Sequence, residues 1–234
     1  PDYGTDEVSD TALAMLLSIS RGIILYDNNC RNYKNSWQEN TINDLKRISE
    51  YKLGVIGAGR IGGSLLIKAK SIGFQTFFFD PYKPIGHDKV TGAKRFDHLD
   101  KLLSFCDIIS IHTPLTQETN GIVDELFISK MKKGSSFINT ARGKIVKNID
   151  VFYKPLKTNY LNFLALDVLP EEPPKSSTLI NAWKDREEWL NGRLIINPHT
   201  AYYSIQSFID MRAKAADNAL RIIKGEKPNN IVSK

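Results

Sequence analysis

Residues 52–80, KLGVIGAGRIGGSLLIKAKSIGFQTFFFD, decide the fold of this 234-residue chain. An apolar run of strand length at residues 53–56 leads into the segment GAGRIG, residues 57–62. Apolar residues then recur at helical spacing, and a second apolar run at residues 74–79 ends on Asp80. A strand, a G-x-G-x-x-G turn, a helix and a second strand that ends in an acid together predict a dinucleotide-binding unit.

Each residue of the turn has a physical role in that prediction. Gly57 permits a tight turn, Gly59 puts no side chain between the backbone and a pyrophosphate, and Gly62 lets the helix pack closely on the strands. Arg60 and Ile61 open the helix, whose N-terminus offers free N–H groups and partial positive charge to a phosphate. We therefore expect these five residues to bind the cofactor. A glycine-rich turn in an unrelated α/β protein is the alternative.

The acid that ends the second strand predicts which cofactor is bound. Asp80 lies 18 residues after Gly62, close to the spacing of about 20 residues expected for an acid that binds the ribose. A carboxylate there accepts hydrogen bonds from the ribose hydroxyls and repels a 2′-phosphate, so we expect NAD rather than NADP. The nearby Lys83 weakens that preference.

Composition excludes several other classes of protein. The net charge is +6 and the pI about 9.2, but the lysines are scattered without a basic stripe among aromatic residues, so we expect no nucleic-acid partner. No apolar run reaches the length of about 18 residues that suggests a membrane span, so we expect no membrane partner. Cys30 and Cys106 have neither metal-ligand spacing nor an evident pairing, which indicates reduced thiols, a cytoplasmic location and no metal site.

Alternating apolar segments predict an α/β fold, a doubly wound parallel sheet of the Rossmann type with helices on both faces. The expected strands are residues 53–56, 74–79, 107–112, 135–139, 163–167 and 193–197. The expected helices are residues 5–25, 61–72, 96–105, 124–131, 148–157, 179–190 and 204–224, with Pro155 shortening or kinking the helix that contains it. Residues 26–50 are expected to form an irregular arm with a helical piece at residues 42–48, and residues 81–92 and 171–175 to form loops.

Polar side chains follow the ends of these strands, at Asp80, Thr113, Arg142, Asp167 and His199. The carboxyl ends of parallel strands meet at one edge of a sheet, and ligands of such sheets bind beyond that edge. The sequence therefore predicts one cleft that contains all five residues.

Three residues have the chemistry for catalysis. The guanidinium of Arg142 is suited to a carboxylate or a carbonyl oxygen, and the imidazole of His199 can donate and accept protons near neutral pH. A carboxylate such as Glu172, placed beside His199, would stabilise the imidazolium. The structural alternatives are a surface arginine, a hydrogen-bonded histidine without a catalytic role, and a solvated acid in a proline-rich loop.

Taken together, these residues resemble a known family. The stretches GVIGAGRIGG, FFFDPY, HTPLTQET, MKKGSSFINTARGKIV, ALDVLPEEPP and NPHTAYYS, within residues 54–204, are similar to the cofactor-binding part of the D-isomer-specific 2-hydroxyacid dehydrogenases. PDYGTDEVSDTALAMLL, DVLPEEPP and PHTAYYS resemble most closely the branch that includes the C-terminal-binding-protein-like dehydrogenases.

The resemblance implies roles for individual residues. Arg142 matches the substrate-binding arginine, His199 the general acid/base, and Glu172 the acid that keeps the histidine protonated, with Glu171 as the less favoured choice. Asp167 matches a residue near the nicotinamide. The positions implied to line the cofactor are Thr113, Pro114, Thr119, Thr140 and Ala141, together with Asp167 and His199.

The chain departs from the family's pattern at four places. Lys147 replaces an acid, Pro155 interrupts a helix, one extra residue separates Arg142 from Asp167, and Tyr202 stands where the most similar branch often has tryptophan. We interpret the first three as local drift, whereas Tyr202 leaves the substrate preference open.

The resemblance also implies a domain organisation. Family members carry roughly 100 residues, typical of one domain, ahead of a start like Pro1, and these form an N-terminal substrate lobe that we expect to be missing from this chain. Residues 1–25 would form a crossing helix, 26–50 an arm, 51–203 the NAD-binding Rossmann domain, and 204–234 a return helix and tail toward the absent lobe.

The predicted function is therefore hydride transfer between NAD and C2 of a small 2-keto or 2-hydroxy acid, by a homodimer formed through the nucleotide-binding domain. The alternative from a different class is an NAD(H)-sensing scaffold of the C-terminal-binding-protein type with little turnover. A third hypothesis is that the chain alone binds NAD but is poorly active without the second lobe.

Overall fold

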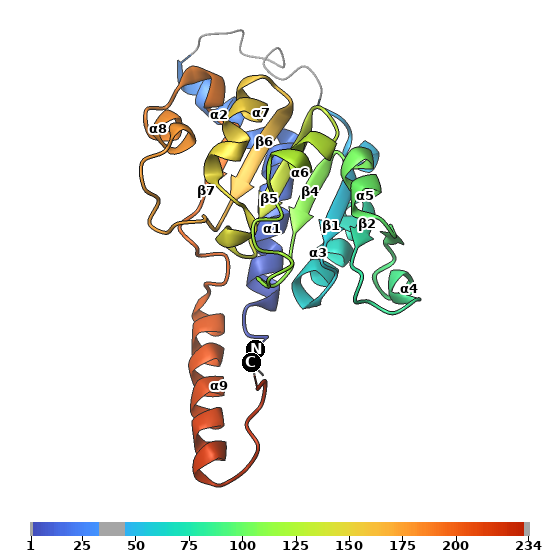
Figure 1. Ribbon diagram of the computed structural model, residues 1–234, viewed down its shortest axis with the longest axis vertical. Helices are drawn as coiled ribbons and strands as arrows, with labels where there is room; N and C mark the ends of the chain where they lie inside the picture. Colours follow the sequence, from blue (N-terminus) through green and yellow to red (C-terminus); the bar gives the residue numbers. More distant parts are fainter. Residues whose placement is uncertain (1, 33–44, 232–234) are drawn as a thin grey trace.

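The structure is a computed structural model that describes residues 2–32 and 45–231 (Figure 1). These residues form a seven-stranded parallel sheet in the order β3-β2-β1-β4-β5-β6-β7. The strands are β1 (Lys52–Ile56), β2 (Gln75–Phe79), β3 (Lys94–Arg95), β4 (Ile108–Ile111), β5 (Ser135–Asn139), β6 (Leu161–Leu166) and β7 (Leu194–Ile196). The chain runs outward from β1 to one edge and then from β4 to the other, which is the doubly wound order and confirms the predicted fold class.

Helices cover both faces of the sheet. The α-helices are α1 (Thr5–Arg21), α2 (Ile23–Asn32), α3 (Arg60–Ser71), α4 (His87–Thr91), α5 (Leu99–Phe105), α6 (Glu125–Lys130), α7 (Tyr153–Lys157), α8 (Thr178–Lys184) and α9 (Ile205–Ile223). Short 3-10 helices lie at Ile48–Glu50, Gly143–Ile145, Ile149–Phe152 and Glu188–Leu190. One apolar cluster joins α1 and α3 to the sheet, and a second joins α5, α6, α7 and α8 to the opposite face.

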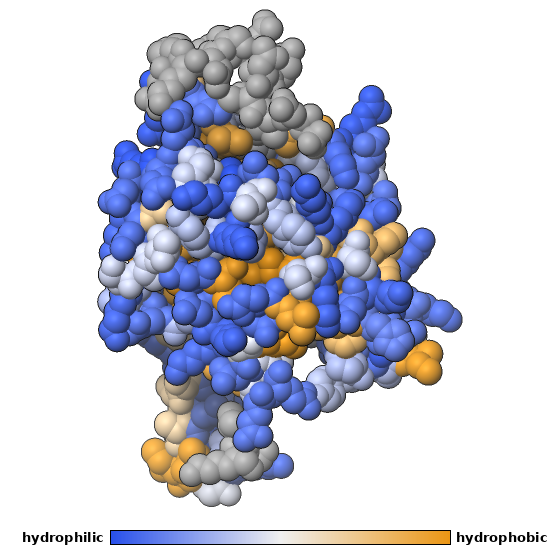
Figure 2. All heavy atoms as spheres, turned by 45° about the horizontal axis from the view of Figure 1, so that its top comes forward, coloured by the Kyte–Doolittle hydropathy of each residue, from blue (hydrophilic) through white to orange (hydrophobic). Residues whose placement is uncertain are grey.

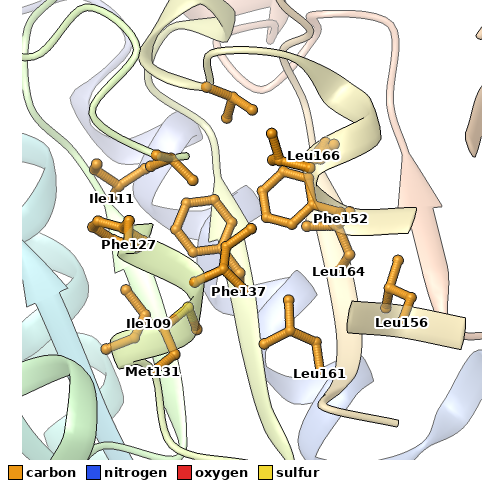
Figure 3. Packing of buried hydrophobic residues seen from close by; sticks show 14 of the residues in the cluster. Ile109, Ile111, Phe127, Met131, Phe137, Phe152, Leu156, Leu161, Leu164 and Leu166 are labelled. Atoms are coloured by element: carbon orange, nitrogen blue, oxygen red, sulfur yellow. The ribbon is translucent and has the colours of Figure 1, made fainter. Parts of the chain in front are cut away.

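The alternation of side chains along the strands builds these two clusters. In β4, Ile108 belongs to the cluster under α1 and α3, whereas Ile109 belongs to the cluster on the other face. The same alternation separates Phe137 from Ile138 in β5. Figure 3 shows the larger cluster, in which rings from β5 and the neighbouring helical segments meet branched side chains of β4 and β6. Successive side chains of a strand point to opposite faces, so the central strands need apolar side chains on both faces of a sheet that helices cover on both sides.

α1 crosses behind the sheet and packs along α3 (Figure 1). The hydroxyls of Ser9 and Ser64 lie 3.1 Å apart, and the Lys68 ammonium contacts the carboxylates of Asp6 and Asp10 at 3.3 and 2.7 Å. The predicted helix 5–25 begins at Thr5 as expected, but it breaks at Gly22, which has a positive φ of 62°. α1 is thereby anchored with its first turn at the carboxyl edge of the sheet.

α9 stands away from the body of the protein, below the carboxyl edge of the sheet (Figure 1). Ser204 and Ser207 form a reciprocal capping box at its start, and Ser207 is its single buried residue. Apolar side chains remain exposed along it, including Ile222 and Ile223 at its far end, where Figure 2 shows an apolar tip. The predicted helix 204–224 is confirmed, and Gly225 follows it with φ of 71°.

The structure differs from the sequence expectations in several connections. α2 continues the helical path through Asn32, so the irregular arm predicted for residues 26–50 is wrong at its start. The helical piece predicted at residues 42–48 falls partly on residues 33–44, outside the described residues, and residues 45–47 are not helical. α4 forms inside the expected loop 81–92, and the two-residue strand β3 was not predicted.

Two predicted helices are shorter than expected. Residues 148–157 divide into a 3-10 helix and α7, in which Pro155 lies in the first turn. Proline is tolerated there because the first N–H groups of a helix have no intrahelical partner. The helix expected at residues 179–190 ends at Lys184, and a separate 3-10 turn, Glu188–Leu190, follows.

No single helix in the described parts of the chain is both long and apolar enough to cross a membrane; α1 and α2 reach that length only as a pair bent by 58°.

Replacing Phe137 with alanine is expected to lower the free energy of unfolding by about 3–5 kcal/mol, because it leaves a cavity in a close-packed core. Phe137 is fully buried and its ring contacts those of Phe127 and Phe152, with centroids 6.1 and 5.5 Å away. Denaturant unfolding followed by circular dichroism measures the loss. Leu126→Ala, at an exposed position of α6, is the control and should change the value by less than about 0.5 kcal/mol. Equal losses for both variants would contradict the assignment.

Candidate active site at the carboxyl edge of the sheet

A cleft of about 470 Å³ opens at the carboxyl edge of the sheet. Ten of the residues predicted from the sequence line it, namely Gly59, Arg60, Ile61, Thr113, Pro114, Thr140, Ala141, Arg142, Asp167 and His199. The predicted residues that do not line it are Gly57, Gly62, Asp80, Thr119 and Glu172. Four of the five polar side chains predicted at the strand ends therefore share this cleft, whereas Asp80 lies outside it.

Two glycines of the turn are required by close packing. A Cβ on Gly62 would lie 2.0 Å from the Gly57 carbonyl oxygen, and a Cβ on Gly57 would lie 2.9 Å from the backbone of His112. Gly57 also has a positive φ of 88°. Gly59 differs, because a Cβ there would meet no atom within 4 Å. Its backbone therefore borders open space in the cleft, as a backbone that approaches a pyrophosphate must.

Asp80 fixes the middle of the turn rather than facing the cleft directly. Its carboxylate accepts hydrogen bonds from the N–H groups of Ala58 and Tyr82, each at 2.9 Å. His87 acts on the same residue from α4, because its Nε2 lies 2.9 Å from the Ala58 carbonyl oxygen. Both backbone groups of Ala58 are thus held by side chains, one of which the sequence analysis missed.

His199 and Glu172 form a direct contact. Nδ1 of His199 lies 2.7 Å from Oε2 of Glu172, and Oε1 of Glu172 accepts the N–H of Leu169 at 2.8 Å. A carboxylate only accepts hydrogen bonds, so Nδ1 carries the donated proton and Nε2 is left free on the ring that lines the cleft. The side chains are 44% and 36% exposed, so the pair is open to solvent in this structure. Glu171 instead pairs with Lys175, which favours Glu172 as the partner.

Asp167 holds the backbone that carries His199. Its carboxylate is buried and accepts the N–H groups of Thr200 and Ala201, at 3.0 Å for the shorter contact to each. Its carbonyl oxygen accepts the N–H of His199 at 2.8 Å. His199 has a positive φ of 58°, an uncommon conformation for a residue with a Cβ. These hydrogen bonds stabilise that conformation and so direct the imidazole.

Asn139 performs the corresponding task for Arg142. It is fully buried at the end of β5, where its side-chain oxygen accepts the N–H of Ala141 at 2.9 Å and its amide donates to the Arg142 carbonyl at 3.1 Å. Nη1 of Arg142 donates to the Ala141 carbonyl at 2.7 Å. Within the described residues the guanidinium forms no ion pair, so it is available to an anion in the cleft.

The polar lining of the cleft fits a dinucleotide. Oγ1 of Thr113 and Oγ1 of Thr140 are buried and have no hydrogen-bond partner in the described structure, so each can bind a ligand that enters. Thr119 is engaged elsewhere, because its hydroxyl donates to the Pro114 carbonyl at 2.6 Å and braces the loop. The open space beside the Gly59 backbone and the two hydroxyls without partners therefore fit the binding of NAD.

His112 is a cleft residue that the sequence analysis did not single out. Burial lowers the pKa of His112 from 6.5 to about 4, so the ring is neutral at physiological pH. Its Nε2 lies 2.8 Å from the Ser110 hydroxyl, while its Nδ1 has no partner among the described residues.

The other lining residues missed from the sequence come from the start of the chain and from the segment after His199. They are Tyr3, Gly4, Thr5, Val8 and Ala201. Tyr202, which the sequence analysis linked to the substrate preference, also lines the cleft. Tyr202 has its ring edge-on to both Tyr3 and His199, with centroids 6.5 Å away in each case. Among the described residues, no group of His, Cys, Asp and Glu side chains is arranged to hold a metal ion.

His112 is expected to make stability depend on pH. Its folded pKa lies below the unfolded value, so the unfolded state binds more protons as the pH falls through 6.5 toward 4. The free energy of unfolding of the wild type should therefore fall across this range by about 3 kcal/mol more than that of His112→Asn. Urea unfolding at pH 7, 5.5 and 4.5 measures the difference. The exposed His98 provides the control, and a wild-type slope that His98→Asn removes and His112→Asn keeps would refute the assignment.

Asn139→Asp is expected to cost about 1–3 kcal/mol of stability, because it replaces a buried amide donor with an acceptor that faces the Arg142 carbonyl. The same change should speed tryptic cleavage after Arg142, an exposed residue whose turn would be released. Denaturant unfolding and limited proteolysis measure the two effects. Asn120→Asp, at an exposed loop position, is the control and should leave both unchanged. Unaltered cleavage after Arg142 in Asn139→Asp would show that the two hydrogen bonds of the Asn139 side chain do not hold the turn at residues 140–142.

Comparison with known proteins gives a consistent picture. The profile of the family described as "D-isomer specific 2-hydroxyacid dehydrogenase, NAD binding domain" matches residues 13–201. The chain is 29% identical to glyoxylate reductases of Korarchaeum cryptofilum and Thermofilum pendens, with all of this chain aligned to 68% and 67% of those proteins. It is also similar to a solved D-lactate dehydrogenase of Aquifex aeolicus complexed with NAD and lactic acid, with a TM-score of 0.83 and 29% identity over 97% of this chain and 68% of that chain. The finer resemblance to the C-terminal-binding-protein-like branch stays a prediction.

Proposed function

Since this chain belongs to the D-isomer specific 2-hydroxyacid dehydrogenases, we propose that it interconverts a small 2-keto acid and the corresponding 2-hydroxy acid with NAD as cofactor. The observation that carries the proposal is the contact of 2.7 Å between Nδ1 of His199 and Oε2 of Glu172. His199 lines the same cleft as Arg142, whose guanidinium forms no ion pair with the described residues. Reduction of a keto acid needs a group that donates a proton to the carbonyl oxygen and a group that binds the carboxylate, and these side chains provide both.

Arg142 binds and orients the substrate. A guanidinium presents several donors in one plane, so it can hold the carboxylate of a 2-keto acid and also donate to the adjacent keto oxygen. The Asn139 clamp fixes the backbone from which this side chain projects. Binding through the carboxylate restricts the substrate to acids and places the carbonyl near His199, which lines the same cleft.

His199 moves the proton. Glu172 accepts the Nδ1 proton, which fixes the orientation of the ring and leaves Nε2 to donate to the keto oxygen during reduction or to accept from the hydroxyl during oxidation. The negative charge of Glu172 stabilises the imidazolium that donates. Asp167 keeps the His199 backbone in place through its buried carboxylate.

The cofactor, when bound, supplies or accepts the hydride at C2 of the substrate. The residues that fit it are Gly59, Arg60 and Ile61 at the start of α3, with Thr113 and Thr140 opposite. The glyoxylate reductase and D-lactate dehydrogenase names of the relatives agree with a substrate of two or three carbons, and they favour the enzyme over the NAD(H)-sensing scaffold.

We also infer the setting in which the enzyme works. The scattered lysines and the absence of a basic stripe in the sequence support a protein without a nucleic-acid partner, and the unpaired cysteines support a cytoplasmic location. The family resemblance supports a homodimer through the nucleotide-binding domain, to which residues 10–50 would contribute. The exposed apolar side chains of α9 support the interpretation that residues 204–234 lead toward a second lobe.

The test is the reduction of glyoxylate and pyruvate by NADH in the full-length protein that contains this chain, followed by absorbance. His199→Ala should lower kcat by about 10²–10⁴, the usual contribution of general acid/base catalysis, with NADH affinity within about threefold of the wild type. Glu172→Gln should lower kcat less, because an amide oxygen still accepts the Nδ1 proton. His98→Ala, an exposed histidine outside the cleft, is the control. If His199→Ala keeps most of the wild-type rate, the proposed acid/base role is wrong.

A further inference from the structure

A second cavity lies at the edge of the sheet opposite the active-site cleft. Its volume is about 610 Å³, and its lining includes residues just before or near the start of four strands, namely Tyr51, Asp107, Ser136 and Asn162. Because the strands are parallel, their amino ends share one edge of the sheet, the upper edge in Figure 1. None of the described residues lines both this cavity and the cleft, so the two can be filled independently. We call this cavity the amino-edge pocket.

The amino-edge pocket has an excess of positive charge. Its basic side chains are Lys46, Arg47, Lys132 and Lys133, and its acidic side chains are Glu50 and Asp107. The basic groups exceed the acidic ones by two. A concave site lined mainly by charge of one sign attracts ions of the opposite sign, so this pocket favours an anion, and a dianion would balance the excess.

Asp107 holds two of the four basic groups in place. Its Oδ1 accepts hydrogen bonds from Nζ of Lys46 at 3.1 Å and Nζ of Lys132 at 2.6 Å, and its Oδ2 accepts the N–H of Lys52 at 3.0 Å. Burial acts to raise the pKa of Asp107, but these donors, with Lys132 the strongest, hold that pKa below its usual value, so the group is a carboxylate. The contacts join the segment before β1 to the turn before β5 and so fix the walls of the pocket.

The other two basic groups remain available to a ligand. Within the described residues, the side chains of Arg47 and Lys133 form no ion pair and no hydrogen bond, and Glu50 pairs with neither of them. Each lies next in sequence to a lysine that Asp107 anchors. Their backbone is therefore held in place, while their charged ends are exposed at the pocket.

Two neutral side chains add hydrogen-bond donors to the pocket. Ser136 is only 4% exposed, and it lies on the same face of β5 as Ile138, toward α1, whose Ile19 lines the same pocket. Within the described residues, neither the Ser136 hydroxyl nor the side-chain amide of the half-buried Asn162 forms a hydrogen bond. Buried polar groups are normally hydrogen-bonded, so these two indicate a ligand with several acceptor atoms.

We propose that the amino-edge pocket is a second anion site, which binds the phosphate group of a small molecule while NAD occupies the cleft. The guanidinium fork of Arg47 suits two phosphate oxygens, and the ammonium of Lys133 adds a charged donor. The hydroxyl of Ser136 and the amide of Asn162 donate to the remaining oxygens. A phosphate dianion accepts hydrogen bonds from several directions and balances the excess of two positive charges, which a monocarboxylate does not.

The test measures phosphate binding at the pocket itself. The amide resonance of Gly134, which lines the pocket, is followed by NMR in the full-length protein saturated with NADH. The probes are inorganic phosphate and glycerol phosphate, each titrated at constant ionic strength against potassium chloride. The same titrations without NADH should give the same dissociation constants, because the cleft and the pocket share no lining residue. This arm keeps the result independent of the proposed function.

The variants are chosen to remove donors without disturbing the core. Arg47→Ala/Lys133→Ala removes both unpaired cations, and Ser136→Ala removes the buried hydroxyl with little change of shape. The matched control is Lys101→Ala/Arg186→Ala, which removes the same charge from exposed positions outside the pocket. Thermal unfolding of each variant verifies that it is folded at the temperature of the titration.

Loss of the two cations should weaken phosphate binding at least about tenfold, because each forms a charged hydrogen bond, and Ser136→Ala should weaken it about threefold. The control should stay within about twofold of the wild type. Glycerol phosphate that binds as tightly as inorganic phosphate would identify a phosphate monoester as the ligand, and binding of inorganic phosphate alone would identify the free anion. The proposal is overturned if phosphate does not shift the Gly134 resonance, if chloride shifts it equally, or if the control loses as much affinity as Arg47→Ala/Lys133→Ala.

Discussion

The close approach of α3 to the end of β1 is the constraint on which the rest of the site depends. A Cβ on Gly62 would lie 2.0 Å from the Gly57 carbonyl oxygen, so the helix can take this position only with glycine there. α1 packs along α3 through Ser9, Ser64 and Lys68, and its start supplies one wall of the cleft. The contact between Gly62 and Gly57 at the end of the central strand β1 thus positions the wall of the cleft that residues 3–8 form.

The parallel sheet then supplies a common edge, and buried polar side chains supply orientation. Asn139 ends β5 and holds the backbone of the residues that follow it. Asp167 follows the neighbouring strand β6 and holds the backbone of Thr200 and Ala201, beyond the end of β7. The first positions Arg142 and the second His199. The two reactive side chains are exposed, whereas Asp167 and Asn139, which hold the backbone that carries them, are buried.

Much of the fold could be predicted because it follows from local patterns. Residues 135–139 form the predicted strand with all five residues buried, and the glycine turn indicated the position of α3. The errors arose where a local pattern had no strong signal. The helix that contains Pro155 is shortened, as expected, but a separate 3-10 helix, Ile149–Phe152, comes before it. α4 is a single turn between two glycines, in a segment that was predicted to be a loop.

The site was predicted less completely, for a physical reason. Strand ends and family resemblance pointed to Arg142, Glu172 and His199, and the structure joins the last two directly. His87 and His112 were missed because their environments exist only in the folded chain. His87 contacts the Ala58 carbonyl, and the fold buries the ring of His112. Tyr3 lies almost two hundred positions from Tyr202 and meets it only through the path of α1.

α9 is capped but has little tertiary packing, so its local stability should be much lower than that of the sheet. A helix of 19 residues with one buried residue has almost no tertiary packing to hold it, and tertiary packing supplies most of the stability of helices in proteins. Its amide protons should therefore exchange with solvent far sooner than those of β1 or β5, whose opening requires the whole core to unfold. Local unfolding of α9 would leave the sheet and the cleft folded, because no residue of α9 lines the cleft.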